Sequence, residues 1–309
     1  MSAPSSGAAP RLTGTILVTG GSGFLGSSLV ARLVGEGHDV VCSTRSPDRR
    51  DLYPGAEWHA CDLADKTEIT SLFARAQPEI VFHYAGLASG IREPANVEPT
   101  LAANLIATVN LLLASLAAGA SRVVLTGSYE EPAIGATPRS PYAASKAGAT
   151  AYARMFSFLY GLSTVVLRPA MVYGPGQRDA TKLVPYVTRC FLRGETPQLS
   201  SGERTVDWVY IDDVTQAFIA AAVTPGISGE VIDVGSGELH SIREVVETLA
   251  AKTGASTPAQ FGELPDRPAE LVGAADTTRA LELLGWKTRT SLDEGLSRTV
   301  ESVRSLVDA

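Results

Sequence analysis

The sequence predicts an α/β protein: a doubly wound parallel sheet with a smaller α/β lobe in the C-terminal part. Short apolar runs alternate with helical stretches through the first half of the 309 residues. Such alternation indicates a parallel sheet with helices on both faces. The first apolar run is followed by glycines spaced three residues apart and then by an amphipathic stretch. A chain of this length has ample material for one large or two moderate domains.

The first strand and the glycine turn after it carry a functional signal. The apolar run 16–18 is followed by Gly20, Gly23 and Gly26, and a helix is expected over 27–35. Glycines at this spacing permit a tight turn, let the backbone approach a ligand and let the helix pack on the strand. The helix N-terminus offers N–H groups to phosphate. The pattern predicts a cradle for a dinucleotide diphosphate; a purely structural turn between strand and helix is the alternative.

The remaining elements follow in order. Strands are expected at 40–42, 80–82, 123–126 and 165–167, and helices at 66–76, 101–118, 143–160, 183–192 and 241–253. We expect residues 12–170 to form the dinucleotide-binding domain, with 205–225 packing back on it, and 171–309 to form mainly the substrate-binding lobe. Residues 1–11, rich in Ser, Ala, Pro and Gly, are expected to be a disordered tail.

Composition excludes several classes of function. A net charge of −7 provides no basic field for nucleic acid or an anionic membrane. The four histidines and three widely spaced cysteines show no metal-ligand spacing, so we expect no metal site. Buried free thiols in a reducing, cytoplasmic compartment are the expected state of the cysteines. Residues 101–118 come nearest to a membrane span, but Asn104 and other polar residues interrupt them, so no membrane segment is expected.

The residues after the second strand bear on the choice of cofactor. Folds that select NAD place an acidic residue here to bind the ribose hydroxyls, whereas this chain has Thr44 and Arg45. A hydroxyl and a guanidinium suit a 2′-phosphate, so the sequence favours NADP and leaves NAD possible. Asp62 follows a further short strand. It is a candidate for binding the adenine amino group, or else a helix cap.

The catalytic signal lies at the start of the helix expected at 143–160. Tyr142 and Lys146 are four residues apart and therefore share a helix face. An ammonium beside a phenol favours phenolate and is expected to lower the phenol pKa. Such a tyrosine can exchange a proton with a carbonyl or alcohol while a nicotinamide handles the hydride. The spacing is common by chance, but it occurs here with the glycine turn and with Ser128 just beyond a strand.

Further motifs extend from residue 14 to about 303. They are Thr19–Gly26, Cys61–Leu63, Phe82–Gly86, Asn104, Tyr142–Lys146, Arg168–Gly176, Asp207–Val214, Val234–Gly237, Ala275–Thr277 and Leu284–Trp286. With these motifs the chain resembles the extended short-chain dehydrogenase/reductase family, and within it the nucleotide-sugar epimerases, dehydratases and 4-ketoreductases. The resemblance implies a Rossmann-type fold, a nucleotide-sugar substrate and a homodimer formed through the segments 100–118 and 143–160.

The resemblance also implies residue roles. Ser128 would hydrogen-bond the substrate carbonyl, Tyr142 would be the acid/base, and Lys146 would hold the nicotinamide ribose. His83, in family terms, closes a strand beside the cofactor and is not a general base. The implied cofactor-binding residues are Gly20, Gly23, Phe24, Leu25, Gly26, Thr44, Arg45, Asp62, Leu63, Tyr84, Ala85, Gly86, Asn104, Tyr142 and Lys146. The implied substrate-binding residues are Ser89, Ser128, Glu130, Arg204 and Arg267.

The chain departs from the family pattern in three respects. Tyr129 stands where dehydratases carry the Asp that protonates the departing hydroxyl, which disfavours dehydration. The segment between Ser128 and Tyr142 is shorter than the resemblance leads us to expect. Met171 and Val206 replace an Asn and an Arg that ordinarily touch substrate phosphate or neighbouring backbone. These replacements leave the substrate identity open.

The predicted reaction is NADPH-dependent reduction of the C4 ketone of a nucleotide-linked 4-keto-6-deoxy sugar. A net reductase needs a supply of reduced cofactor, usually NADPH, so Thr44 and Arg45 favour it. The two glutamates after Ser128 and Tyr129 also resemble the 4-ketoreductases. Tyr142 would protonate O4 while Ser128 steadies the oxyanion. The alternatives are a nucleotide-sugar 4-epimerase with retained NAD, a reductase of a ketone without a nucleotide, and a non-enzymatic NADP sensor.

Overall fold

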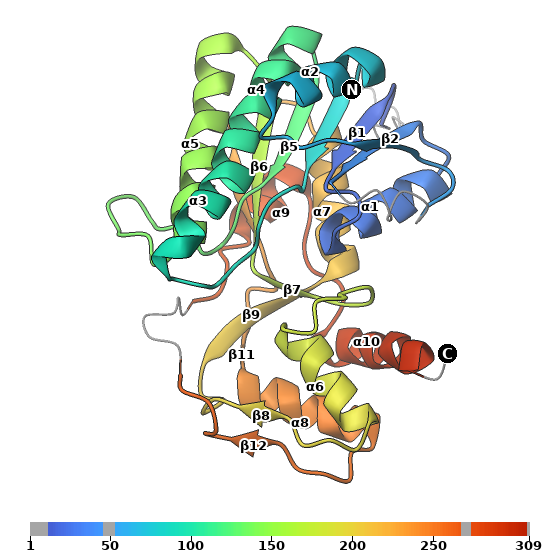
Figure 1. Cartoon of the computed structure of the whole chain (residues 1–309), viewed down its shortest axis with the longest axis vertical. Coiled ribbons are helices and arrows are strands. Elements are labelled where there is room, and N and C mark those ends of the chain that lie inside the picture. The colour runs from blue at the N-terminus through green and yellow to red at the C-terminus, as the bar shows by residue number, and fades with distance from the viewer. Residues whose placement is uncertain (1–11, 46–52, 267–272, 308–309) are drawn as a thin grey trace, which may run out of the picture.

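A seven-stranded parallel sheet forms the centre of the upper lobe of the molecule (Figure 1). The computed structural model describes residues 12–45, 53–266 and 273–307. The strand order is β10-β6-β5-β4-β1-β2-β3. The strands are β1 Ile16–Thr19, β2 Val40–Thr44, β3 Glu57–Ala60, β4 Ile80–His83, β5 Arg122–Thr126, β6 Thr164–Pro169 and β10 Val231–Val234. The predicted parallel sheet of Rossmann type is confirmed, and the second half of the chain contributes its edge strand β10.

Helices cover both faces of the sheet. One face carries α1 (Phe24–Gly35), α7 (Ile211–Val223) and α9 (Thr278–Leu284), and the other carries α2 (Lys66–Ala76), α4 (Ala107–Ala118) and α5 (Pro141–Tyr160). Strand β1 packs against both layers, because Ile16 and Val18 join the first core cluster and Leu17 joins the second. A strand buried on both faces explains why its sequence is apolar throughout, without polar alternation.

The order of the strands determines where a ligand can bind. Strand β1 lies between β2 and β4: β2 and β3 extend the sheet on one side of β1, and the order then reverses, with β4, β5 and β6 on the other side. In open α/β sheets, ligands bind in the crevice at the carboxyl ends of the strands on either side of such a switch. The glycine turn follows β1, and the segment with Tyr84 follows β4. Both loops therefore open on the same crevice.

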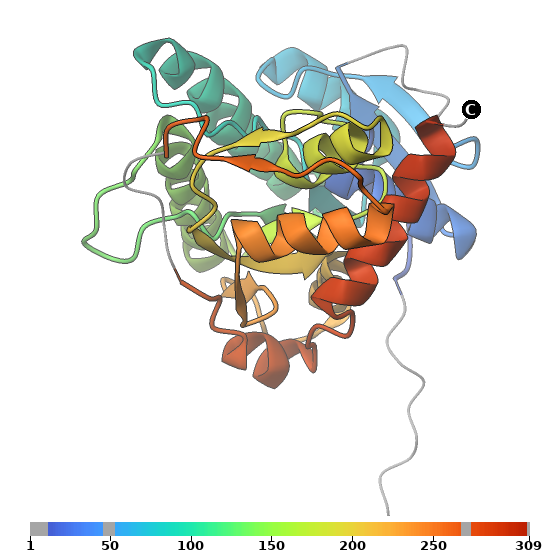
Figure 2. The ribbon, with the colours of Figure 1, turned by 90° about the horizontal axis from the view of Figure 1, so that it is seen from below.

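The lower lobe has its own small sheets and core. Its three-stranded sheet has the order β11-β9-β7, and β12 pairs with β8. The elements are β7 Met171–Tyr173, α6 Leu183–Leu192, β8 Gln198–Leu199, β9 Thr205–Tyr210, β11 Leu239–Ser241, α8 Ile242–Thr253, β12 Gln260–Phe261 and α10 Leu292–Val307. Figure 2 shows α8 in orange and α10 in red packed beside each other in this lobe. Aromatic and aliphatic side chains of α6, α8, α10 and β9 form its core.

In the described part of the chain, one helical segment is long and apolar enough, by length and composition, to cross a membrane. It runs over Pro94–Ala118 and comprises a short 3₁₀ turn (η2, Pro94–Asn96), α3 (Val97–Thr100), a π-helical turn (η3, Leu101–Ile106) and α4. The expectation that Asn104 and other polar residues keep this stretch from having the apolar content of a membrane span is wrong, because they are too few. Leu111 and Leu112 of the same segment are buried in the core against the sheet, as the leucines of a core helix in a globular domain are.

Candidate active site

The glycine turn between β1 and α1 brings the backbone close to the β4 loop. Gly20 has a φ of +68°, and a Cβ atom there would lie 2.6 Å from the backbone nitrogen of Ala85. A Cβ on Gly26 would lie 2.2 Å from the carbonyl oxygen of Gly20. Gly23 is the N-cap of α1 and provides no side-chain cap, so the first N–H groups of the helix, those of Phe24 and Leu25 among them, have no intrahelical acceptor. The turn therefore fits a diphosphate at a helix N-terminus.

The residues predicted to bind the adenosine end lie after β2 and β3. Thr44 is buried, and its hydroxyl is hydrogen-bonded to that of Ser22 in the glycine turn, at 2.8 Å. Arg45 is exposed directly after it. The Asp62 carboxylate accepts the N–H of Ala64 at 3.0 Å, while Asp65 caps α2. The Leu63 side chain is buried in the core. Asp62 thus forms a local turn and is not the helix cap.

Asn104 joins the loop after β4 to helix α5. Its side-chain oxygen accepts the N–H of Leu87 at 2.7 Å, and its amide nitrogen donates to the Leu87 carbonyl and to the Ser145 hydroxyl, at 3.1 and 2.9 Å. It lies in the π-helical turn η3, and such turns are frequent at functional sites. A Cβ on Gly86 would lie 2.8 Å from Asn104 Oδ1 and 3.6 Å from Lys146 Nζ. Gly86 is therefore where the predicted cofactor loop meets the predicted catalytic lysine.

The structure brings Ser128, Tyr142 and Lys146 together. Helix α5 begins at Pro141, and its N-cap Ser140 accepts the N–H of Ala143 at 3.0 Å, which places Tyr142 and Lys146 in the first two turns. The Ser128 side chain is hydrogen-bonded to the Tyr142 hydroxyl. Lys146 is buried, and its ammonium donates to the backbone carbonyl of Thr126 at 2.7 Å. Of the three side chains, that of Lys146 lies beside the loop at Gly86.

The ionisation of this group differs from the expectation. Burial raises the pKa of Tyr142 to about 12; the Ser128 hydrogen bond lowers it, and the charges of Glu130 and Glu131 raise it further. Burial lowers the pKa of Lys146 to about 8, which Glu131 opposes. The predicted lowering of the phenol pKa by the ammonium is therefore wrong for this arrangement. The loss of hydration dominates for both groups, and the ammonium is directed at a backbone carbonyl.

His83 has a structural role, in agreement with the resemblance. Its two ring nitrogens are hydrogen-bonded to the hydroxyls of Thr19 and Thr108, at 2.7 and 2.9 Å. Burial and the charge of Lys146 lower its pKa to about 3. The imidazole is therefore neutral near pH 7 and holds β1, β4 and α4 together. A cavity of about 10 Å³ between His83 and Lys146 has room for about one water molecule.

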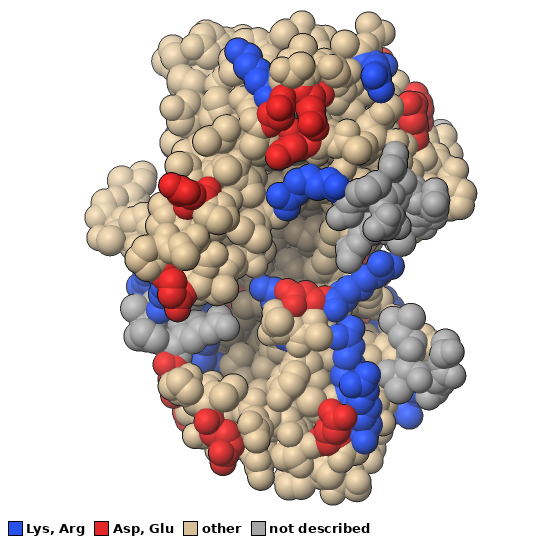
Figure 3. Space-filling model, in the orientation of Figure 1, with Lys and Arg blue, Asp and Glu red and all other residues tan. Residues whose placement is uncertain are grey.

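A hollow lies between the two lobes, visible in Figure 3 with Lys and Arg side chains at its border. The candidate substrate residues are placed as follows. Ser89 accepts the N–H of Ile91 at 3.3 Å. Glu130 lies close enough to Tyr142 to raise its pKa. Arg204 precedes β9 in the lower lobe, where its carbonyl accepts the N–H of Ile242. Arg267 lies outside the described residues.

Two residues in this region received no role from the sequence. Glu131 is buried beneath Ser128 and accepts its backbone N–H at 2.7 Å. The pair of glutamates after Tyr129 was the available signal, but spacing alone could not show which of the two turns inward. Tyr129, at the position of the dehydratase Asp, donates its hydroxyl to the Ala274 carbonyl at 2.8 Å, so it ties the site to the C-terminal part.

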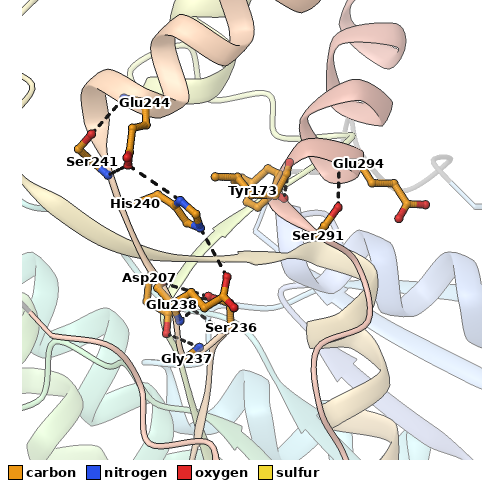
Figure 4. Close-up of polar contacts among 11 residues, drawn as sticks. Tyr173, Asp207, Ser236, Gly237, Glu238, His240, Ser241, Glu244, Ser291 and Glu294 are labelled. Carbon is orange, nitrogen blue, oxygen red and sulfur yellow. Dashed lines mark hydrogen bonds and ion pairs between the residues drawn. The ribbon is translucent and has the colours of Figure 1, made fainter.

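Asp207 of β9 joins segments that are far apart in the chain, and Figure 4 shows it beside Ser236 and Gly237. Its buried carboxylate accepts the N–H and hydroxyl of Ser236, the N–H of Gly237 and the N–H of Ala275, at 2.7 to 3.1 Å. A Cβ on Gly235 would lie 2.4 Å from the same carboxylate. This one side chain therefore connects β9 to the loop after β10 and to the segment before α9.

Comparison with known proteins places this geometry in a family. The model of the NAD dependent epimerase/dehydratase family matches residues 16–235. A UDP-glucose 4-epimerase of Mycolicibacterium smegmatis is 35% identical, over 94% of this chain and 98% of its own length. Among solved structures, the UDP-glucose 4-epimerase of Thermotoga maritima with UDP-glucose has a TM-score of 0.85 at 31% identity, covering 95% of this chain and 99% of that one.

A second solved structure shows the same extent of similarity. The UDP-glucose 4-epimerase of Thermus thermophilus in complex with NAD has a TM-score of 0.82 at 29% identity, covering 94% of this chain and 99% of that one. The similarity thus spans both lobes in each case. The resemblance found in the sequence is confirmed, and the chain belongs to the NAD-dependent epimerase/dehydratase family.

Proposed function

We propose that this protein is an NAD-dependent 4-epimerase of a UDP-linked hexose. The observation that carries the proposal is the group of Ser128, Tyr142 and Lys146 beside Gly86 and the glycine turn, in a chain whose similarity to UDP-glucose 4-epimerases extends over almost its whole length. This reading was the alternative at the level of sequence. It now takes precedence over the 4-ketoreductase, because the relative at 35% identity and the two solved structures described above, which match both lobes, are named as UDP-glucose 4-epimerases.

The chain's own groups suit this reaction. In a 4-epimerase the C4 hydroxyl must lose its proton as the C4 hydrogen leaves as hydride; the ketone must then regain hydride on the opposite face of C4 and a proton on O4. Tyr142 would take and return the proton at O4, and Ser128 would hydrogen-bond the same oxygen. Lys146 would bind the nicotinamide ribose. When bound, the nicotinamide cofactor supplies the acceptance and return of hydride.

The choice between NAD and NADP is part of the proposal. The glycine turn fits the diphosphate that NAD and NADP share. A side chain at Gly20 or Gly26 would clash with neighbouring backbone and prevent the tight turn. A 4-epimerase returns the hydride that it removed, so it needs no external reductant and normally keeps NAD bound. Thr44 already bonds Ser22, which weakens the sequence argument for a 2′-phosphate site. Exposed Arg45 still favours NADP and, with it, a reductase.

We further propose a cytoplasmic homodimer. Among the described residues, many exposed large apolar side chains lie on two adjoining helical segments, α3–η3–α4 and α5; they are Val97, Leu101, Ile106, Leu113, Tyr152, Phe158, Leu159 and Tyr160. A second copy packed on these helices would cover them. All three cysteines are buried and free, which suits a reducing compartment.

Direct turnover tests the proposed reaction. The purified protein is incubated with UDP-glucose, and with UDP-glucuronic acid in parallel, without added reductant, and the C4 epimer is followed by NMR. The nucleotide released on denaturation is identified by chromatography. We expect the native protein to form the C4 epimer and the denatured protein to release NAD. Tyr142→Phe should form no epimer. Consumption of NADPH with an NDP-4-keto-6-deoxy sugar and no epimerisation would restore the reductase.

A further inference from the structure

Glu131 is a buried carboxylate folded back under the turn that carries Ser128. It is 7% exposed, its Oε1 accepts the Ser128 N–H at 2.7 Å, and its own N–H donates to the Ser128 carbonyl at 3.1 Å. A Cβ on Gly127 would lie 2.6 Å from the same Oε1. The carboxylate therefore occupies space that only a glycine at position 127 leaves open, and it holds the backbone of Ser128 in place.

The groups around this carboxylate come from three elements. Helix α5 contributes Lys146, Tyr142 and Thr150, β6 contributes Arg168, and the turn contributes Ser128. Arg168 is already paired with Asp233 of β10, its Nε donating to the carboxylate at 2.6 Å. The Lys146 ammonium, in contrast, donates to the uncharged carbonyl of Thr126. Among the described residues, Glu131 is the one charged side chain that raises the Lys146 pKa.

The two side chains contact the residues on either side of Gly127: the Lys146 ammonium donates to the Thr126 carbonyl, and the Glu131 carboxylate accepts the Ser128 N–H. Through the Ser128 N–H, Glu131 sets the position of the hydroxyl that bonds Tyr142. Through its charge, it stabilises the ammonium form of a lysine whose pKa burial has lowered to about 8. Burial also raises the pKa of Glu131 itself, and the Ser128 N–H, Arg168 and Lys146 oppose that shift. With a neutral side chain at position 131, burial would lower the pKa of Lys146 without the opposing effect of the Glu131 charge.

We propose that Glu131 is a positioning residue of this site: its carboxylate holds the Ser128 turn against Tyr142 and is the buried counter-charge of Lys146. The consequence for turnover rests on the proposed epimerase function. Glu131 does not touch the reacting atoms in this arrangement. It acts through Ser128 and Lys146.

Three variants separate the charge from the geometry. Glu131→Gln keeps the side-chain length and an oxygen for the Ser128 N–H but removes the charge. Glu131→Asp keeps the charge but shortens the reach to Ser128. Glu247→Gln, at an exposed position of α8 in the lower lobe, is the matched control for the loss of one carboxylate. Circular dichroism and thermal melting establish that each variant is folded.

Two measurements are made on the full chain. The first is the pH dependence of kcat for the UDP-hexose that the wild type accepts. The second is a ¹⁵N NMR titration of the lysine side chains, which does not depend on turnover; the chain has only five lysines, and the Lys146→Arg spectrum identifies the Lys146 signal. For Glu131→Gln we expect the Lys146 titration and the alkaline limb of kcat to move down together by about one pH unit. Glu247→Gln should leave both unchanged.

Glu131→Asp tests the other part of the proposal, that the carboxylate holds the Ser128 turn in place. Glu131→Asp should lower kcat roughly tenfold or more, since small displacements of a reacting group are costly, with an alkaline limb close to that of wild type. An unmoved Lys146 titration in Glu131→Gln, or a wild-type kcat in Glu131→Asp, would overturn the proposal. If the wild type epimerises no UDP-hexose while Lys146 still responds to Glu131→Gln, the proposed function fails and the counter-charge stands.

Discussion

The ammonium of Lys146 donates a hydrogen bond of 2.7 Å to the backbone carbonyl of Thr126, the last residue of β5. This contact fixes the first two turns of α5 against the carboxyl end of the central sheet. It also explains the charge state of the site, because a carbonyl dipole satisfies one ammonium N–H without providing a full counter-charge. Burial then lowers the pKa of Lys146 to about 8, near the range in which the enzyme would work.

The first prediction concerns the pH dependence of stability. The pKa of Lys146 is about 8 when folded and 10.5 in its ordinary environment, so the unfolded chain binds more protons between these values. The contribution of Lys146 to the free energy of unfolding therefore rises as the pH increases through this window. Lys146→Met lacks this dependence. We expect the wild type to gain about 2 kcal/mol relative to Lys146→Met between pH 7 and pH 10, measured by urea unfolding; a constant difference would contradict it.

The second prediction concerns the glycine turn. Gly26→Ala would place a Cβ atom 2.2 Å from the carbonyl oxygen of Gly20, so the turn and the start of α1 must separate. We expect loss of bound nicotinamide cofactor, measured by chromatography of the released nucleotide. Gly35→Ala, at the other end of the same helix, meets no atom within 4 Å and is the control. It should retain the cofactor and be more stable by about 0.5 kcal/mol.

The third prediction concerns cofactor choice. Arg45 is exposed directly after β2, at the position where the sequence predicts a guanidinium that binds the phosphate distinguishing NADP from NAD. For an NAD enzyme, Arg45→Ala should change the affinity for NADH less than twofold. The affinity for NADPH should fall about tenfold, which corresponds to about 1.4 kcal/mol. Fluorescence titration with NADH and with NADPH measures both affinities. Tighter binding of NADPH than of NADH by the wild type would contradict the NAD proposal and favour NADP, as the sequence does.

The fourth prediction concerns the lower lobe. Asp207→Asn replaces a carboxylate oxygen with an amide nitrogen facing N–H groups of Ser236, Gly237 or Ala275. A buried donor without an acceptor costs about 2 kcal/mol, so the midpoint of urea unfolding should fall accordingly. Asp293→Asn, an exposed partner of Lys252, is the control and should change stability by less than about 1 kcal/mol. Equal effects of the two substitutions would show that the Asp207 network does not support the lobe.

The sequence alone determined the parallel sheet, the glycine turn and the positions of Tyr142 and Lys146. These features depend on local patterns: apolar runs that must be buried on both faces, glycines that permit close backbone approach, and a helical spacing that holds two side chains on one face. The family could be inferred for the same reason, since its motifs lie at these local turns.

The tertiary structure decided the electrostatics and the partners of these groups. Burial reversed the expected direction of the Tyr142 pKa, and desolvation is a property of everything packed around a residue, which no spacing records. Thr44 bonds Ser22 across two loops, and Asp207 bonds segments far along the chain. Of two adjacent glutamates, only the fold shows that Glu131 turns inward beneath Ser128, because Gly127 leaves room for its carboxylate there.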